Sequence, residues 1–192
     1  MYQDVIIAGF GGQGVMLIGD LLANAAMESG YNVTYMPVYG VEMRGGTANC
    51  TVVVSDDEIG SPIIHSPMSL IAMNRPSVDK FQPRLRDGGV LIANASIVAE
   101  ELLHSGRCRA YPVPLNALAD ELGNAKMANV VALGAWLQAT GLLPLKEVAD
   151  LLARTFAQKS EKLAELNRQA LLKGAESLRR AAEKDPSLQA AG

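Results

Sequence analysis

The sequence contains few of the residues that build metal centres and catalytic sites. Only two cysteines, Cys50 and Cys108, and two histidines, His65 and His104, occur among 192 residues, with no Cys-x-x-Cys spacing. Such a set is too small to hold an iron–sulfur cluster or a structural zinc ion, so we expect no metal site in this chain. We expect both cysteines to be free thiols in a reducing cytoplasm.

No nucleophile is paired with a base in the sequence. The two histidines lie in unrelated contexts, and neither is near a serine or cysteine motif. His65 is expected to be a loop or packing residue. The chain therefore has no predicted catalytic residue of its own.

An excess of basic charge is also lacking. The net charge is −3, and the 17 lysines and arginines are scattered, so neither nucleic acid nor an anionic membrane surface is an expected partner. The N-terminal residues show no basic region of a signal peptide. The uncharged segment 127–145 is long enough to span a bilayer, but it contains Asn129 and Gln138 and is interrupted by Gly141. We expect a buried helix there, and a cytoplasmic protein.

The hydrophobic residues that are present, 49% of the chain, suffice for one core. We expect one domain over residues 1–184 and a flexible tail over residues 185–192. Short apolar runs bounded by glycine, proline or acidic residues predict strands, and helical periodicity separates several of them. The expected fold is α/β, a single doubly wound, mainly parallel sheet with a Rossmann-like first βαβ unit and helices from about residue 116. The predicted strands are 4–8, 33–36, 47–55, 69–73 and 89–93.

A glycine turn follows the first predicted strand and opens a helix that ends near Gly30. Its spacing fits G-x-G-x-x-G, a pattern that lets backbone N–H groups and a helix N-terminus face a phosphate. The candidate binding residues are Gly9, Gly11, Gly12, Gln13 and Gly14. A tight turn that only packs helix against strand remains an alternative.

A second glycine-rich loop follows the strand at 33–36. If the sheet is doubly wound, this loop lies at the carboxyl edge near the first turn, where an arginine beside exposed amides suits a phosphate or carboxylate. An ion pair between Arg44 and Glu42 that braces the loop is the alternative. The candidate binding residues here are Glu42, Arg44, Gly45, Gly46 and Thr47.

Binding of NAD would need an acidic residue near the end of the second strand to hold the ribose hydroxyls. Met36 and Pro37 occupy that place, and the nearest acid, Glu42, lies in the following loop. A stand-alone NAD(P)-binding Rossmann enzyme remains an alternative, but the missing acidic residue argues against it.

The chain resembles the gamma subunit of the thiamine-diphosphate-dependent 2-oxoacid:ferredoxin oxidoreductases, most of all that of the 2-oxoglutarate enzymes. The resemblance rests on the two glycine loops at 7–15 and 39–48, and it extends to 71–74, to Gly88-Gly89, to Asn129 with 133–135, and to 165–174. It covers the chain to about residue 180. The glycine turn alone is a weak signal, whereas the two loops together at this spacing are specific.

The resemblance implies a non-catalytic subunit of a complex that converts a 2-oxoacid, most of all 2-oxoglutarate, and coenzyme A to acyl-CoA and carbon dioxide, reducing ferredoxin. It places thiamine diphosphate and the iron–sulfur clusters on partner subunits. Coenzyme A is the one ligand that this chain is expected to help bind, through Arg44 and the glycine turn. A purely structural assembly subunit is the remaining alternative.

The last predicted helix carries an apolar stripe from Leu163 to Leu178 opposite a charged side. The stripe is expected either to pack within the chain or to dock on another subunit. Unpartnered faces of this kind also favour a homodimer when the chain is isolated.

Overall fold

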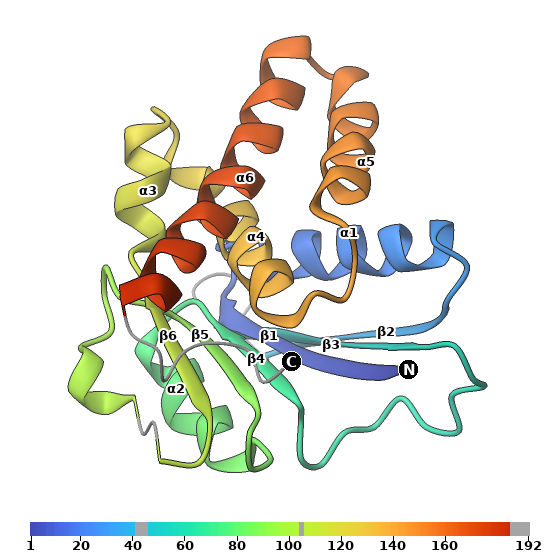
Figure 1. Ribbon diagram of the computed structural model, residues 1–192, viewed down its shortest axis with the longest axis vertical. Coiled ribbons are helices and arrows are strands. Elements are labelled where there is room, and N and C mark those ends of the chain that lie inside the picture. The colour runs from blue at the N-terminus through green and yellow to red at the C-terminus, as the bar shows by residue number, and fades with distance from the viewer. Residues whose placement is uncertain (41–45, 104–105, 185–192) are drawn as a thin grey trace.

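The computed structural model describes residues 1–40, 46–103 and 106–184. They form one six-stranded sheet with helices on both faces (Figure 1). The strands are β1 (Tyr2–Phe10), β2 (Asn32–Tyr39), β3 (Thr47–Ser55), β4 (Ser69–Ala72), β5 (Val90–Asn94) and β6 (Arg109–Val113). The helices are α1 (Val15–Glu28), α2 (Arg75–Phe81), α3 (Leu115–Glu121), α4 (Ala128–Thr140), α5 (Leu145–Ala157) and α6 (Glu161–Lys184), with 3₁₀ turns η1 (Gln82–Arg84), η2 (Glu100–Leu102) and η3 (Ala125–Met127).

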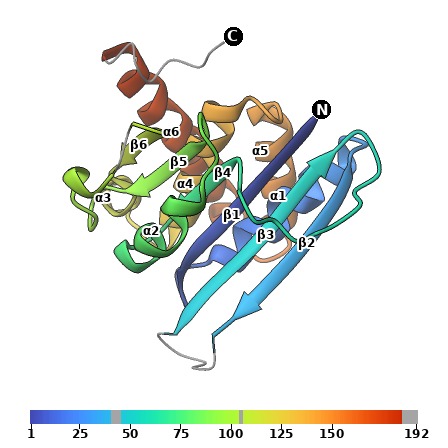
Figure 2. The ribbon, with the colours of Figure 1, turned by 90° about the horizontal axis from the view of Figure 1, so that it is seen from below.

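The strand order is β2-β3-β1-β4-β5-β6. Strands β1, β4, β5 and β6 pair in parallel, whereas β3 is antiparallel to both of its neighbours, β1 and β2 (Figure 2). The predicted mainly parallel α/β fold is confirmed. The Rossmann-like order of the first unit is not, because β3 lies between β1 and β2.

The central strands are buried on both sides, which explains their continuous apolar runs. Along β1, Val5 and Ile7 belong to the larger core under α1, α4, α5 and α6, while Ile6 and Ala8 belong to a smaller core beneath α2. The two cores thus lie on opposite faces, as the period of two along a strand requires.

Three strands differ from the prediction. β1 runs from Tyr2 to Phe10, so Gly9 and Phe10 of the predicted turn lie inside the strand. β2 continues to Tyr39, so Met36 and Pro37 lie inside it and not at its end. The strand at the other edge, β6, was not predicted at all, because Arg109 and Pro112 interrupt its apolar pattern. Both prolines are tolerated because each lies in an edge strand, where a missing N–H need not break a ladder.

The uncharged segment forms α4, and nearly all of its residues are buried. None of the described helices combines the length and the apolar character needed to cross a bilayer. A Cβ atom on Gly134 would lie 1.9 Å from the carbonyl oxygen of Leu171, and one on Gly174 would lie 1.9 Å from that of Val131. Glycine at these two positions therefore allows α4 and α6 to pack with their backbones in contact.

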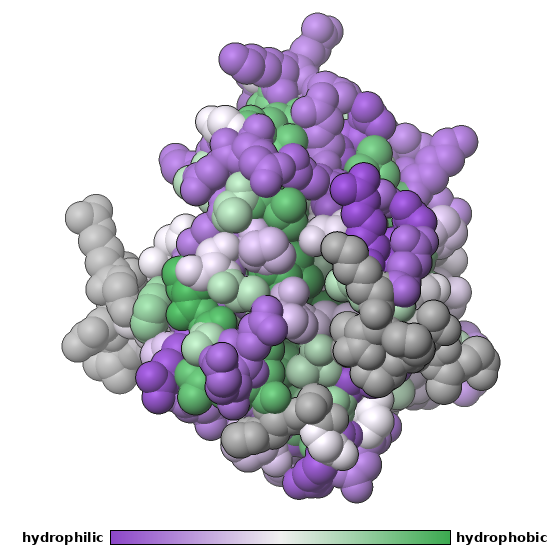
Figure 3. All heavy atoms as spheres, turned by 60° about the vertical axis from the view of Figure 1, so that its left-hand side comes forward, coloured by the Kyte–Doolittle hydropathy of each residue, from purple (hydrophilic) through white to green (hydrophobic). Residues whose placement is uncertain are grey.

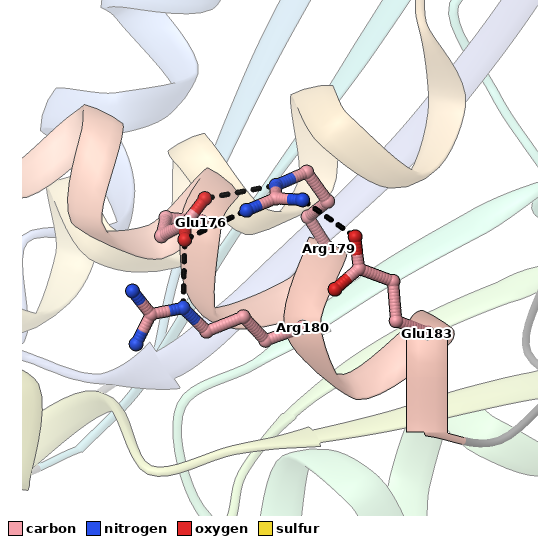
Figure 4. A network of polar contacts seen from close by, with 4 residues as sticks. All are labelled: Glu176, Arg179, Arg180 and Glu183. Carbon is pink, nitrogen blue, oxygen red and sulfur yellow. Dashed lines mark hydrogen bonds and ion pairs between the residues drawn. The ribbon is translucent and has the colours of Figure 1, made fainter.

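Helix α6 uses its apolar stripe within the chain, against α4 and α5, where Ala170, Leu171 and Leu178 are buried. Its outer side is occupied by ion pairs of its own. Glu176 accepts hydrogen bonds from Arg179 and Arg180, and these lower its pKa to about 2 (Figure 4). Arg179 and Arg180 are thus paired within α6 itself.

Candidate functional site

The two predicted loops meet at the carboxyl edge of the sheet. The turn leaves β1 at Phe10, which pairs with Thr47 at the start of β3. The N–H of Gly11 donates to the carbonyl of Gly46 at 2.9 Å. The structure therefore brings Gly46 and Thr47 beside the turn, as predicted; Glu42, Arg44 and Gly45 lie outside the described residues.

Two of the glycines are required by close packing. A Cβ on Gly9 would lie 2.7 Å from Oε1 of Gln13, and one on Gly14 would lie 2.1 Å from Nδ2 of Asn129. Asn129 comes from α4 and donates to the carbonyl of Gly14 at 3.2 Å. Packing alone therefore explains why these two positions are glycine.

Gly12 differs from them. It is exposed, and a Cβ placed on it would have no atom within 4 Å. Its φ of +99° still favours glycine. The space over Gly12 is thus open to a ligand, and protein packing does not explain the absence of a side chain there.

The side chain of Gln13 turns inward and holds the loop. Its Oε1 accepts from the N–H of Phe10 at 2.7 Å and from Nδ2 of Asn74 at 2.9 Å, and its Nε2 donates to the carbonyl of Met73 at 3.4 Å. Gln13 was predicted as a binding residue, but these bonds make it a support for the turn.

The inward bonds also decide which amides a ligand can use. The N–H groups of Phe10, Gly11 and Gln13 are already bonded within the protein. Within the described residues no acceptor meets the amides of Gly12 and Gly14, and Gly14 caps α1 without a side-chain hydrogen bond. The remaining donors are these two amides and the first turn of α1, where the helix dipole favours an anion.

A row of carboxamides, which was not predicted from the sequence, continues the site across the sheet. After Asn74, which follows β4 and caps α2, comes Asn94 at the end of β5. Asn94 donates to the carbonyl of Met73 at 3.3 Å and to Oδ1 of Asn116 at 3.0 Å. The recurrence of asparagine after strands was the available signal, because the ends of parallel strands meet at one edge.

This edge contains a topological switch point. From β1 the chain enters α1 on one face of the sheet, and from β4 it enters α2 on the other face (Figure 1). Ligands of open α/β sheets bind in such crevices, outside the carboxyl ends of the strands. A cavity of about 280 Å³ opens there, lined by Gly12 and Gln13 together with residues of α3, η3 and α4.

The site does not reproduce a dinucleotide-binding Rossmann site. Since β3 separates β1 from β2, the end of β2 is two strand spacings, roughly 9–10 Å, from β1. That end carries Val38 and Tyr39 and no acid. A dinucleotide site needs an acidic residue on a strand next to β1 to hold the ribose hydroxyls. Here the end of β2 is too far from β1, and it carries no acidic residue.

Of the two cysteines, Cys50 lies close to the glycine turn, since its Sγ is 3.5 Å from the carbonyl oxygen of Val15, the residue after Gly14. Cys50 and Cys108 are free and belong to the two different cores, and burial raises the pKa of Cys50 to about 12. His65 is exposed in the loop before β4. Within the described part of the chain, no group of three or more His, Cys, Asp or Glu residues could hold a metal ion.

Several large hydrophobic side chains are exposed around the site. Leu17 of α1, Val38 and Tyr39 at the end of β2, and Ile97 after β5 are 40%, 43%, 71% and 51% exposed. On the side of the molecule that carries α3 and β6, hydrophobic groups interrupt a largely hydrophilic surface (Figure 3).

Known proteins are similar to this chain in sequence and in fold. The family model described as pyruvate ferredoxin/flavodoxin oxidoreductase matches residues 4–177. The ketoisovalerate oxidoreductase subunit VorA of Methanothermobacter thermautotrophicus is 41% identical over 174 residues, which are 90% of this chain and 35% of VorA. The 2-oxoglutarate synthase subunit KorC of Methanothermobacter marburgensis is 32% identical over 167 residues, covering 84% of this chain and 90% of KorC.

A solved structure agrees with both. The keto/oxoacid ferredoxin oxidoreductase gamma subunit of Geobacter sulfurreducens superimposes with a TM-score of 0.81 at 27% identity, covering 94% of this chain and 98% of that one. The chain spans about a third of VorA but nearly all of KorC and of the Geobacter subunit. The resemblance to gamma subunits is confirmed: the chain belongs to the pyruvate ferredoxin/flavodoxin oxidoreductase family.

Proposed function

We propose that this chain is the gamma subunit of a cytoplasmic, multi-subunit 2-oxoacid:ferredoxin oxidoreductase, and that its carboxyl edge helps to bind coenzyme A. The contact of Gly11 with Gly46 carries the proposal, because it joins the two loops beside the amides of Gly12 and Gly14, which no acceptor among the described residues meets. Phosphate groups of coenzyme A would meet the Gly12 amide and the first turn of α1. Arg44, known here from sequence alone, would add a cation.

The redox chemistry belongs to partner subunits in this proposal. Cys50 and Cys108 lie in separate cores, and a cluster needs four ligands at one point, so the residues described here do not fit an iron–sulfur cluster. Thiamine diphosphate is likewise assigned to a partner. Alone, the chain is expected to be colourless and inactive towards 2-oxoacids.

We assign 2-oxoglutarate as the 2-oxoacid substrate of the complex, with ketoisovalerate as the alternative. Correspondence with KorC over nearly its full length supports 2-oxoglutarate. The higher identity to VorA supports ketoisovalerate. Comparing kcat/KM of the purified complex for the two acids decides between them, and a clear preference for ketoisovalerate overturns the first assignment.

Gly12→Asp in the assembled complex tests the role in binding coenzyme A. The aspartate places a negative charge beside the proposed phosphate, and about 1 kcal/mol of repulsion at 4 Å in a water-like dielectric raises the KM for coenzyme A about fivefold. Arg44→Ala is expected to raise it as well, with KM for the 2-oxoacid unchanged.

Gly88→Asp is the matched control, since Gly88 also has a positive φ and open space but lies at the opposite edge of the sheet. It should leave KM for coenzyme A unchanged. If KM for coenzyme A is unchanged in both Gly12→Asp and Arg44→Ala, this chain does not bind coenzyme A. Its role would then be that of a structural assembly subunit.

A further inference from the structure

A second cavity lies at the amino edge of the sheet, where the parallel strands begin. Gln3, Val90 and Arg109 line it from the starts of β1, β5 and β6, and Thr140 lines it from the end of α4. The cavity has a volume of about 240 Å³. Sites for drug-sized ligands measure roughly 300–1,000 Å³, so this one suits a smaller molecule with a short carbon chain.

The neutral side-chain donors of the cavity are engaged within the protein. Nε2 of Gln3 donates to Oγ of Ser69 at 2.7 Å. The hydroxyl of Thr140 donates to the carbonyl of Trp136 at 2.9 Å. The main donors left to a ligand are therefore those of two arginines, Arg86 and Arg109. Apolar walls complete the cavity, and they are formed by Met68, Val90 and Ala139.

Arg109 carries a charge that no described acidic residue compensates. Its side chain is partly buried, and among the residues that the structure describes it forms no ion pair. Its Nη1 atom is buried and has no hydrogen-bond partner there. A hydrogen bond with the side chain of Tyr111 holds the guanidinium group at the sheet. An uncompensated charge in a partly buried position is unfavourable, and an anion bound beside it would remove that cost.

Arg86 gives the cavity a second cation. Its Nη2 lies 3.8 Å from Oδ2 of Asp4, too far for a hydrogen bond, and donates to the carbonyl of Ser66 at 3.4 Å. The side chain is 46% exposed, so its other nitrogens are free to turn toward a ligand. Asp87, the acidic residue in the cavity wall, is paired with Arg107 at 2.8 Å. The cavity therefore favours an anion.

We propose that this cavity binds a short dicarboxylate. One carboxylate pairs with Arg109 and the other with Arg86, in the forked geometry that guanidinium groups form with carboxylates. The carbon chain between them lies against the apolar walls, which an inorganic phosphate would leave uncovered. The proposal is independent of the proposed function, because the amino edge lies at the opposite ends of the strands from the glycine turn.

Isothermal titration calorimetry of the full chain, at constant ionic strength, tests the site with glutarate, pentanoate and phosphate. Glutarate and pentanoate have the same number of carbon atoms and differ by one carboxylate. Glutarate should therefore bind about tenfold more tightly than pentanoate, and more tightly than phosphate. Absence of glutarate binding, or phosphate binding as tight as that of glutarate, would overturn the proposal.

Two variants assign the binding to the arginines. Arg109→Gln should weaken glutarate about tenfold. Arg86→Gln should lower the affinity for glutarate to about that of pentanoate and leave pentanoate unchanged, because only the second carboxylate loses its partner. Arg75→Gln is the matched control, since Arg75 is an exposed arginine of α2 that pairs with Asp79, and it should change neither affinity.

Urea unfolding without ligand shows whether each variant is folded. If Arg109→Gln does not fold, Arg86→Gln still decides, because Arg86 is largely at the surface. Wild-type affinity for glutarate in a folded Arg109→Gln or in Arg86→Gln would contradict the dicarboxylate site.

Discussion

Replacing Gly14 by alanine perturbs the point where α4 holds the glycine turn. Gly14 has a φ of +75°, and Gly12, two residues before it, has a φ of +99°. Alanine at either position is strained by about 1–2 kcal/mol, the cost of a left-handed conformation for a residue with a Cβ. The two variants therefore share the backbone penalty and differ in what the new methyl group meets.

At Gly12 the methyl group meets nothing within 4 Å, whereas at Gly14 it would lie 2.1 Å from Nδ2 of Asn129. Asn129 is 4% exposed and has no solvent to move into. Its displacement breaks the bond to the Gly14 carbonyl at 3.2 Å and the one from the Val130 N–H at 2.8 Å. At about 1 kcal/mol for each bond, Gly14→Ala should cost about 2 kcal/mol more than Gly12→Ala.

Urea unfolding followed by the fluorescence of the single tryptophan, Trp136, measures the difference, because that side chain is fully buried in the folded state. With a slope of about 2 kcal/mol per molar urea, the midpoint of Gly14→Ala should lie about 1 M below that of Gly12→Ala. In an Asn129→Ala background the clash is gone, and the two glycine variants should cost the same. Equal midpoints in the wild-type background would refute the packing account of Gly14.

Three further variants test other parts of the structure. Gln13→Ala leaves the N–H of Phe10 without its acceptor and should lower stability by about 1–3 kcal/mol in urea unfolding, whereas Gln13→Glu keeps that acceptor and should cost less. Gly174→Ala places a methyl group against the carbonyl of Val131 and should cost about 1–3 kcal/mol, with Gln169→Ala as a neutral control; a wild-type midpoint would contradict the close α4–α6 contact. Burial raises the pKa of Asp4 in the folded state, so the folded protein binds this proton more tightly than the unfolded chain and loses stability as pH rises from about 4 through the raised pKa. In urea unfolding across that pH range, the Asp4→Asn variant should lack this loss of stability. Parallel pH profiles for the wild type and the variant would contradict the role of Asp4.

The features that local sequence determines could be predicted. The turn after β1, the glycine that ends α1 at Gly30 and the buried helix α4 each follow from residue type and spacing over a few positions. The meeting of the two loops also followed, because the carboxyl edge of a doubly wound sheet gathers its loops. The contact of Gly11 with Gly46 has this origin.

The features that depend on long-range pairing could not be predicted. Nothing in the residues of β3 indicates that it inserts between β1 and β2 with opposite direction, since a strand buried on both faces has the same composition in either orientation. The inward position of Gln13 depends on Asn74, sixty-one residues later. In sequence, Asn74 is equally well explained as a helix cap, a role that it also has.

Purification of the tagged chain from the cells that naturally produce it tests the central claim most directly. The preparation should contain a thiamine-binding and a cluster-binding subunit, and it should reduce ferredoxin only when both a 2-oxoacid and coenzyme A are present. Recovery of the chain as a monomer that is active with a nicotinamide cofactor, or of a complex whose ferredoxin reduction does not depend on a 2-oxoacid, would contradict the account.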